Sequence, residues 1–148
     1  MHRRSRLGTL AGLALVLVGC TSAIKVAPYE GADDGSCDFV ADAWPARVAG
    51  QEPVVTAVES TSVAAWGEPA IIARCGGPIP GPTTDQCLDI DGVDWVATEL
   101  DDGVQFTTYG RSPALEVLVP DDYEPQALLM PAFTDVAMMV DQGDRRCS

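Results

Sequence analysis

Five short runs of apolar and β-branched residues in the middle of the chain predict a β-sheet. They cover residues 54–58, 70–75, 93–100, 104–109 and 114–119, and glycine, proline or aspartate flanks them. Between the third and fourth runs, Asp101, Asp102 and Gly103 supply turn chemistry, which predicts a β-hairpin over residues 93–109. We expect the strands to be antiparallel.

A short helix is predicted before the first strand. Ser36 can cap this helix and Pro45 must end it. Its apolar face needs a sheet to pack against, and it consists of Phe39, Val40, Ala43 and Trp44.

A second helix is predicted near the C-terminus, because Leu129, Phe133, Val136 and Val140 recur at helical spacing. Pro131 must start, kink or split this helix. Helix, several strands and helix together predict an α+β domain: an antiparallel sheet of four to five strands with an N-terminal and a C-terminal helix packed on one face. The chain has no internal repeat.

The N-terminus has the layout of an export signal. His2, Arg3, Arg4 and Arg6 form a basic patch, and an uncharged stretch follows over residues 7–19. This apolar run is shorter than the roughly 20 residues that a membrane-spanning helix needs, so a cleaved signal peptide over residues 1–19 is favoured.

The residues at the predicted cleavage site resemble the lipobox of bacterial lipoproteins. Leu17, Val18 and Gly19 precede Cys20 in the order branched, small, small, cysteine. We therefore expect cleavage before Cys20, a lipid such as palmitate on that cysteine, and attachment to the outer face of the cytoplasmic membrane. The alternative is an ordinary signal peptide followed by an incidental cysteine.

Removal of the signal leaves an acidic protein. Residues 1–19 contain three of the nine basic residues and none of the 22 acidic ones, so six basic residues face 22 acidic ones, a formal charge of −16. This charge opposes binding to phosphate backbones, and nucleic acid is not an expected partner. Residues 20–36 are small, polar and acidic, which predicts a flexible, lipidated tether before a single domain over residues 37–148.

Four cysteines remain once Cys20 is assigned to lipid. An even number in an exported chain predicts two disulfides. Of the three connectivities, we favour Cys75 with Cys87, because the Gly- and Pro-rich segment between them is typical of a loop that a disulfide closes, and this leaves Cys37 with Cys147. A zinc site is the alternative, but the cysteines lack paired close spacing and the mature chain has no histidine.

Several short motifs resemble a known family. They read Ala-Trp-Gly-Glu-Pro at 65–69, Arg-Cys-Gly-Gly at 74–77, Gly-Val-Asp-Trp at 92–95 and Thr-Thr-Tyr-Gly-Arg-Ser-Pro at 107–113. In this order they resemble an uncharacterised family of actinobacterial lipoproteins, the domain of unknown function DUF3515, over most of the mature chain. The resemblance implies an envelope protein without assigned catalytic residues. Gly77 is a mild departure from the family pattern, where an apolar residue is usual.

Three aspartates form the one local hint of a cation site. Asp89, Asp91 and Asp94 lie close together, and clustered carboxylates suit calcium. Counted from Asp89, however, the fifth and twelfth positions are Val93 and Leu100, where an EF-hand needs oxygen ligands. A turn leading into the hairpin is therefore favoured, and no metal or cofactor is predicted.

Two arginines and three aromatic residues make the candidate ligand site. We hypothesise that Arg74 and Arg111 line one groove with Trp66, Trp95 and Tyr109, where guanidinium groups beside aromatic faces would hold a carboxylate, a phosphate-bearing ligand or a glycan. The alternative is that the arginines form internal salt bridges and the aromatic side chains belong to the core.

These observations predict a lipid-anchored binding or scaffolding module of the cell envelope, non-enzymatic, with an envelope protein or wall polymer as partner. The mature chain has no histidine and no Gly-x-Ser-x-Gly elbow, which argues against a nucleophilic enzyme. The competing hypothesis is an envelope hydrolase that acts on wall polymer through paired carboxylates.

Overall fold

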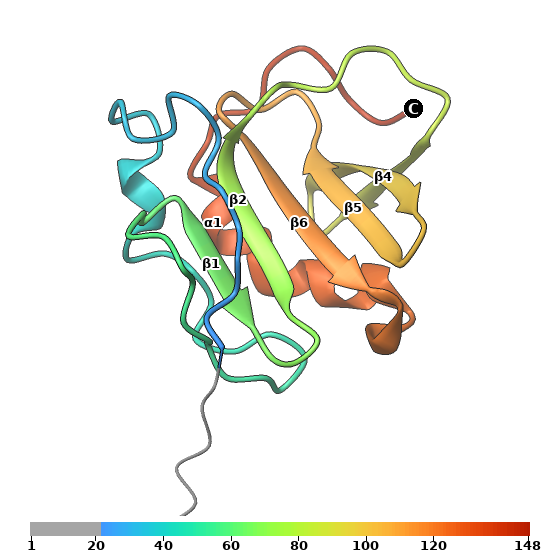
Figure 1. Ribbon diagram of the computed structural model, residues 1–148. Helices are drawn as coiled ribbons and strands as arrows, with labels where there is room; N and C mark the ends of the chain where they lie inside the picture. The colour runs from blue at the N-terminus through green and yellow to red at the C-terminus, as the bar shows by residue number, and fades with distance from the viewer. Residues whose placement is uncertain (1–21) are drawn as a thin grey trace, which may run out of the picture.

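Six strands form one antiparallel sheet in the computed structural model, which describes residues 22–148 (Figure 1). Their spatial order is β1-β2-β6-β5-β4-β3, so only β2 and β6 are neighbours that lie far apart in sequence. The fold is mostly β with a small helical part at the C-terminus. The strands are β1 (Val63–Trp66), β2 (Ile71–Gly77), β3 (Gln86–Ile90), β4 (Val93–Leu100), β5 (Gly103–Thr108) and β6 (Ala114–Pro120).

Four of the five predicted strands are confirmed within two residues at each end: β2, β4, β5 and β6. The predicted strand at 54–58 is wrong. That segment runs along the edge of β1 and makes only isolated backbone contacts, such as Val54 N–H to Ala65 O, while Val55 is 75% exposed. Strands β1 and β3 were not predicted.

Turn chemistry fixes two hairpins in the sheet. In the predicted β4–β5 hairpin, Leu100 faces Gly103 across the two aspartates at the turn. In the β3–β4 hairpin, Asp91 and Gly92 have φ of 52° and 79°, as a two-residue type I′ turn requires. The favoured interpretation of the aspartate cluster as a turn therefore agrees with the backbone, although the strand before that turn was missed.

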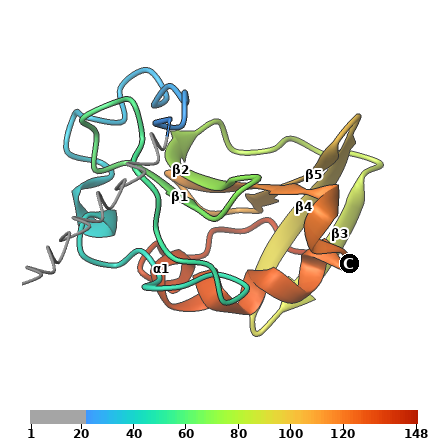
Figure 2. The ribbon, with the colours of Figure 1, turned by 60° about the horizontal axis from the view of Figure 1, so that its bottom comes forward.

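A 13-residue helical segment covers one face of the sheet. It begins as the 3-10 helix η3 (Gln126–Phe133) and continues directly as α1 (Thr134–Met138). Pro131 lies inside η3, where the missing N–H disfavours regular α-helix. The segment lies behind the sheet in Figure 1 and on one side of it in Figure 2. The predicted C-terminal helix is confirmed, mostly as 3-10 helix.

The core lies between this segment and the sheet. Trp66 and Phe133 pack edge to face with ring centroids 5.6 Å apart, and Trp44 packs on the other side of Trp66 at 6.3 Å. Trp95 and Phe106 are also buried. Each aromatic pair of this kind contributes about 1 kcal/mol of stability beyond what the burial of its apolar area contributes.

The predicted N-terminal helix shrinks to the three-residue 3-10 helix η1 (Asp38–Val40). Ser36 does not cap it, since the residue before η1 is Cys37, whose side chain is committed to a disulfide. Residues 41–44 continue as turns that bring Trp44 onto the core. A third 3-10 helix, η2 (Asp121–Tyr123), follows β6.

Both disulfides are present, but the favoured pairing is wrong. The structure joins Cys37 to Cys75 and Cys87 to Cys147. Cys75 lies in β2 and Cys87 in β3, and β6, β5 and β4 lie between these strands. Four inter-strand spacings of ~4.8 Å exceed the Cα separation that a disulfide can bridge. The loop that follows Cys75 therefore crosses the sheet instead of returning to it.

Residues 22–36, expected to be a flexible tether, lie against the domain. Ile24 N–H bonds to Val55 O at 2.9 Å, and Ala57 N–H bonds back to Ile24 O at 2.8 Å. Ala32 is 2% exposed. Contact with the fold thus begins at Ile24 rather than at Cys37. Cys20 and the signal peptide lie outside the described residues.

Candidate functional site

A row of side chains crosses the face of the sheet that lies opposite the helical segment, here called the outer face. Arg74 of β2 is the cross-strand partner of Glu116 in β6, and Glu116 is the partner of Thr107 in β5. Thr107 in turn faces Val96 of β4. Four strands therefore bring one residue each into a continuous line, which no local sequence pattern reveals.

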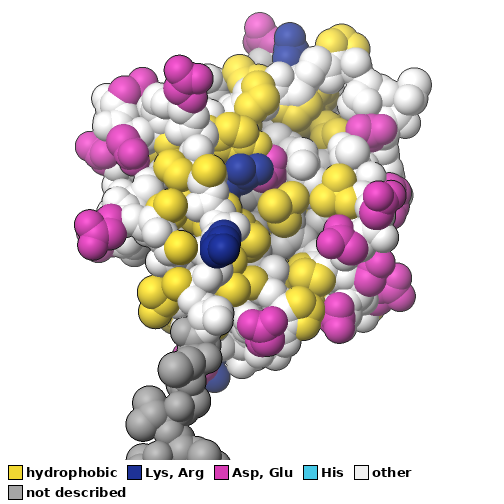
Figure 3. All heavy atoms as spheres, viewed as in Figure 1, with side chains coloured by type: hydrophobic (Ala, Val, Ile, Leu, Met, Phe, Trp, Pro, Cys, Tyr) yellow, Lys and Arg dark blue, Asp and Glu magenta, His cyan; other side chains and the backbone are white. Residues whose placement is uncertain are grey.

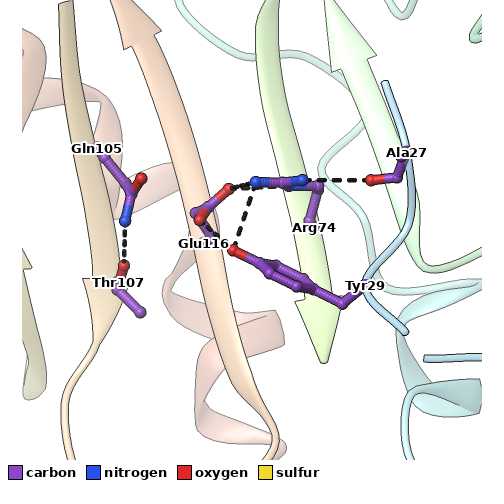
Figure 4. Close-up of polar contacts among 6 residues, drawn as sticks. All are labelled: Ala27, Tyr29, Arg74, Gln105, Thr107 and Glu116. Carbon is purple, nitrogen blue, oxygen red and sulfur yellow. Dashed lines mark hydrogen bonds and ion pairs between the residues drawn. The ribbon is translucent and has the colours of Figure 1, made fainter. Parts of the chain in front are cut away.

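Arg74 and Glu116 form an ion pair at the centre of this row (Figure 4). Arg74 Nε donates to Glu116 Oε1 at 2.8 Å, and Nη2 donates to the same carboxylate. Nη1 donates to Ala27 O at 3.2 Å. Glu116 is only 3% exposed, so the pairing satisfies a carboxylate that burial would otherwise strongly disfavour.

Tyr29 completes the cluster from the N-terminal segment. Its ring lies under the guanidinium of Arg74, 4.4 Å from centroid to Cζ, and its hydroxyl donates to Glu116. Burial, together with the hydrogen bond to Glu116 and the negative charge of that carboxylate, raises the pKa of Tyr29 to about 12, although Arg74 opposes the shift. The phenol therefore stays protonated to a higher pH than an exposed tyrosine does.

The Arg-Cys-Gly-Gly motif builds this cluster. Arg74 enters the ion pair and Cys75 enters the buried disulfide, while Gly76 has φ of 97° at a bulge in the β2–β6 pairing. A Cβ at Gly77 would lie 3.0 Å from Cε2 of the Tyr29 ring. Gly77 therefore leaves the space that the ring of Tyr29 occupies.

A groove of about 400 Å³ lies beside the cluster on the outer face. Its floor carries Thr98, Gln105, Thr107 and Glu116 from the three strands β4, β5 and β6. Tyr29 forms one wall, and residues 78–82, here called the proline loop, form the other. In Figure 1 the connection from β2 to β3, which contains the proline loop, arches over this end of the sheet. We call the groove that these residues line the outer groove.

The floor of the outer groove is polar except for Val96, and it is uncharged apart from its ends. Gln105 Nε2 donates to Thr107 Oγ1 at 3.3 Å (Figure 4), and Thr98 Oγ1 donates to Asp85 Oδ2 at 2.8 Å. None of the described lining residues is basic. In Figure 3, which shows the outer face, hydrophobic and uncharged side chains surround two basic side chains near the centre, and most acidic side chains gather toward the edges.

The C-terminal segment, residues 139–148, holds the proline loop in place. Arg145 Nη1 donates to Pro80 O at 2.7 Å, and Gly143 N–H bonds to Gly110 O at 2.7 Å. The disulfide from Cys147 to Cys87 fixes the end of the segment to β3. One wall of the outer groove therefore depends on contacts from the last ten residues of the chain.

The five residues predicted to share one groove are not brought together. Arg74 lies on the outer face, whereas Trp66 and Trp95 are 1% and 0% exposed in the core between sheet and helix. Trp66 Nε1 donates to Pro45 O at 3.0 Å. For Arg74 and the tryptophans the geometry matches the alternative of an internal ion pair and core aromatics.

Arg111 and Tyr109 lie in the connection between β5 and β6, under the C-terminal segment. Arg111 is 6% exposed and donates to Val140 O. Burial and the nearby Arg146 lower the pKa of Arg111, while Asp94 and Asp141 oppose that shift. Tyr109 O accepts from Gln142 Nε2 at 3.0 Å. Both residues secure the C-terminal segment, and neither lines the outer groove.

The aspartate cluster is built into the β3–β4 hairpin. Asp89 Oδ1 accepts from Gly92 N–H at 3.0 Å, and Asp94, 4% exposed, faces Arg146 at 3.9 Å. Across residues 22–148, no group of three or more His, Cys, Asp or Glu side chains is placed to hold a metal ion. Over the same residues, no helix is long and apolar enough to cross a membrane.

A family model described as a protein of unknown function, DUF3515, matches residues 13–142. The chain belongs to the DUF3515 family. No curated protein and no solved structure matched it. The two disulfides of this DUF3515 domain indicate that it folds in an oxidising, extracytoplasmic compartment.

Sequence reasoning missed most of the outer groove of this DUF3515 domain. Tyr29 was assigned to a tether, and Glu116 went unnoticed although a single charge inside the apolar run 114–119 is a usable signal. Gln105 and Thr107 carry no signal of their own, because they become neighbours of Glu116 only through the β5–β6 register. Arg74, which the sequence analysis placed in a ligand groove, lies beside the outer groove and is paired with Glu116.

Proposed function

We propose that this DUF3515 protein is a lipid-anchored, non-enzymatic binding module of the cell envelope that holds its ligand in the outer groove. The observation that carries the proposal is the groove itself: about 400 Å³, a polar floor from three strands and two apolar walls. A concave site of this size with a few convergent polar groups is the usual form of a ligand site.

The lipid anchor is supported by the sequence before the described residues and by where the fold begins. Cys20 precedes Ile24 by four residues, and the backbone of Ile24 is bonded to Val55 and Ala57. A chain of four residues spans at most roughly 14 Å. A lipid on Cys20 would therefore hold the domain close to the bilayer surface, nearer than a long flexible tether would.

Binding is favoured over hydrolysis because Glu116, one of the two carboxylates at the groove, is buried in an ion pair, which leaves no free pair of carboxylates. Glu116 is held by Arg74 and Tyr29, and Asp85 accepts from Thr98. A glycosidase needs one carboxylic acid and one carboxylate free to face the scissile bond. No observation favours the paired-carboxylate hydrolase as a second candidate.

The anchor is tested by labelling growing cells with an alkyne-bearing fatty acid. The natural protein should incorporate the label and fractionate with membranes, and a Cys20→Ala form should do neither. Labelling that persists in Cys20→Ala would place the lipid elsewhere, and absence of label in both forms would remove the anchor from the proposal.

The ligand site is tested by photo-cross-linking in intact cells. A photoreactive phenylalanine replaces Ile79, which lines the groove and is 40% exposed, or in a matched control Val55, which is 75% exposed and outside it. The proposal expects an adduct from position 79 that position 55 does not give. Identical adduct patterns from both positions would contradict a ligand site in the outer groove.

A further inference from the structure

We infer that the ligand of the outer groove is a neutral oligosaccharide. This inference rests on the proposed function, because it names the ligand class of the same site. It comes from the chemistry that lines the groove: which charges are free, which hydrogen-bonding groups are free, and which surfaces are apolar.

Anionic ligands do not match the groove. None of its described lining residues is basic. The guanidinium of Arg74 beside it already donates hydrogen bonds to Glu116, Ala27 O and Tyr29. The mature chain carries six basic and 22 acidic residues, so its overall field also repels anions. A phosphate or carboxylate would meet no unpaired positive charge here.

A cationic group finds only one carboxylate to pair with, at the end of the floor. Glu116 is 3% exposed, paired with Arg74 and bonded by the Tyr29 hydroxyl, so its charge is neutralised within the protein. The other carboxylate at the groove, Asp85, is exposed at the opposite end and accepts from Thr98 Oγ1. The floor between these carboxylates is neutral.

Main-chain recognition of an extended peptide is also disfavoured. The floor belongs to β4, β5 and β6; β5 and β6 have a neighbouring strand on both sides, and β3 pairs with β4 as far as Ala97. An added strand would find an open edge only along the last residues of β4, from Thr98 to Leu100, which is too short for an extended peptide. Ligand contacts on this floor must come from side chains.

The polar side chains of the floor keep hydrogen-bonding capacity that suits vicinal hydroxyls. Thr107 Oγ1 accepts from Gln105 Nε2, which leaves its own O–H to donate, and Thr98 Oγ1 donates to Asp85, which leaves its lone pairs to accept. Gln105 keeps its amide oxygen and a second N–H. The walls are the ring of Tyr29 and the prolines of the proline loop, which offer flat apolar surfaces. A saccharide combines hydroxyl edges with an apolar C–H face, and the groove presents the complement of both.

The experiment is saturation-transfer NMR on the full processed protein, purified from membranes in a non-glycosidic detergent that cannot occupy the groove itself. Chitotriose, cellotriose and maltotriose are offered at roughly 10 mM, well above the Kd of a weak millimolar site. A neutral tetrapeptide is offered at the same concentration. The variants are Gln105→Ala and Thr107→Val, with Gln126→Ala on the helical segment as matched control.

We expect saturation transfer to at least one trisaccharide, and a three- to tenfold weaker Kd in Gln105→Ala and Thr107→Val with no change in Gln126→Ala. No transfer to any of the three saccharides overturns the saccharide inference. If the tetrapeptide then binds and the same two variants weaken it, the proposed function stands and only the ligand class falls. If neither class binds, or if the groove variants bind as the control does, both fall.

Discussion

At the residue scale, the cluster of Arg74, Glu116 and Tyr29 shows how the outer face tolerates charge. A carboxylate that is 3% exposed is stable there because a guanidinium and a phenol both donate to it. Removing one member leaves the others buried without a partner, which costs more than the intact pair contributes. The cluster therefore gives three separate predictions.

Replacing Glu116 by glutamine should destabilise the protein and shift the titration of Tyr29. The variant leaves Arg74 half-buried without its counter-charge, for a loss of about 2 kcal/mol. It also removes the carboxylate that helps to raise the pKa of Tyr29 to about 12, so that pKa should fall. Phenolate absorbance against pH measures this pKa, and comparison with Tyr29→Phe identifies the part of the titration that belongs to Tyr29. An unchanged high-pH transition would show that Glu116 does not contact Tyr29.

Stability should also fall at alkaline pH because of Tyr29. Its pKa of about 12 in the folded state exceeds the value of 10.0 that applies when the chain is unfolded. The unfolded chain therefore loses this proton first, and the stabilisation present below pH 10 is lost as the pH rises toward 12. Denaturant unfolding should show a steeper decline over this window in the natural protein than in Tyr29→Phe. Parallel curves would contradict the assignment.

Gly77 should tolerate no side chain, because the ring of Tyr29 occupies the space. Gly77→Val is expected to push this ring from under Arg74, lowering both the melting temperature and the pKa of Tyr29. Gly81→Val is the matched control, since a Cβ there meets no atom within 4 Å. Equal melting temperatures for the two variants would mean that Tyr29 does not pack on β2.

Arg74 could be selected from sequence because an arginine inside an apolar strand is conspicuous, but its partners could not. Glu116 lies 42 positions away and Tyr29 45 positions away, and only the β2–β6 register and the path of the N-terminal segment bring them together. Trp66 and Trp95 were misplaced for the same reason. The alternation of side chains along a strand predicts which residues share a face of the sheet. It does not predict which of the two faces the helical segment covers.

At the element scale, local chemistry predicted what depends on neighbours in sequence. The β4–β5 hairpin follows from its turn residues, and the C-terminal helix follows from apolar spacing. The sequence analysis placed a strand at residues 54–58 and none at β1, because both segments are short and apolar. Which of the two forms a strand depends on pairing with β2. The predicted pairing of Cys75 with Cys87 was wrong for a similar reason. It depends on where the chain goes after β2, and the connection from β2 to β3 crosses to the far edge of the sheet.

The two disulfides should differ in what they stabilise. Cys37 and Cys75 are 1% and 0% exposed, so Cys37→Ser/Cys75→Ser loses about 4 kcal/mol of chain-entropy stabilisation and also buries two hydroxyls. Cys87→Ser/Cys147→Ser loses a comparable chain-entropy stabilisation, about 4 kcal/mol for a separation of 60 residues, buries no fully enclosed hydroxyl, and should also loosen the C-terminal segment and, through Arg145 and Pro80, the proline loop.

Denaturant unfolding and hydrogen exchange distinguish these effects. The first pair of substitutions should lower the unfolding midpoint more. The second should raise exchange in residues 139–148 and 78–85 while the sheet stays protected. Uniform exchange throughout the sheet in Cys87→Ser/Cys147→Ser would contradict a local role, and non-reducing peptide mapping checks the connectivity directly.

At the scale of the whole molecule, the antiparallel sheet with a helical cover was predictable and the N-terminal boundary was not. The composition of residues 20–36 is typical of a tether, but Ile24, Tyr29 and Ala32 contact the fold and Tyr29 walls the groove. A few contacts are enough to order a polar segment, and composition does not register them. The domain and any lipid on Cys20 are consequently closer than the sequence indicated.

One measurement tests both the anchor at Cys20 and the ligand in the outer groove. Photo-cross-linking from position 79 in intact cells is compared between the natural protein and a Cys20→Ala form that is exported and folded in equal amount. We expect an envelope adduct from the natural protein, absent from position 55, that is lost or strongly reduced in Cys20→Ala. The same adduct at equal yield from both forms would contradict the need for the anchor, and no groove-specific adduct from either would contradict the binding module.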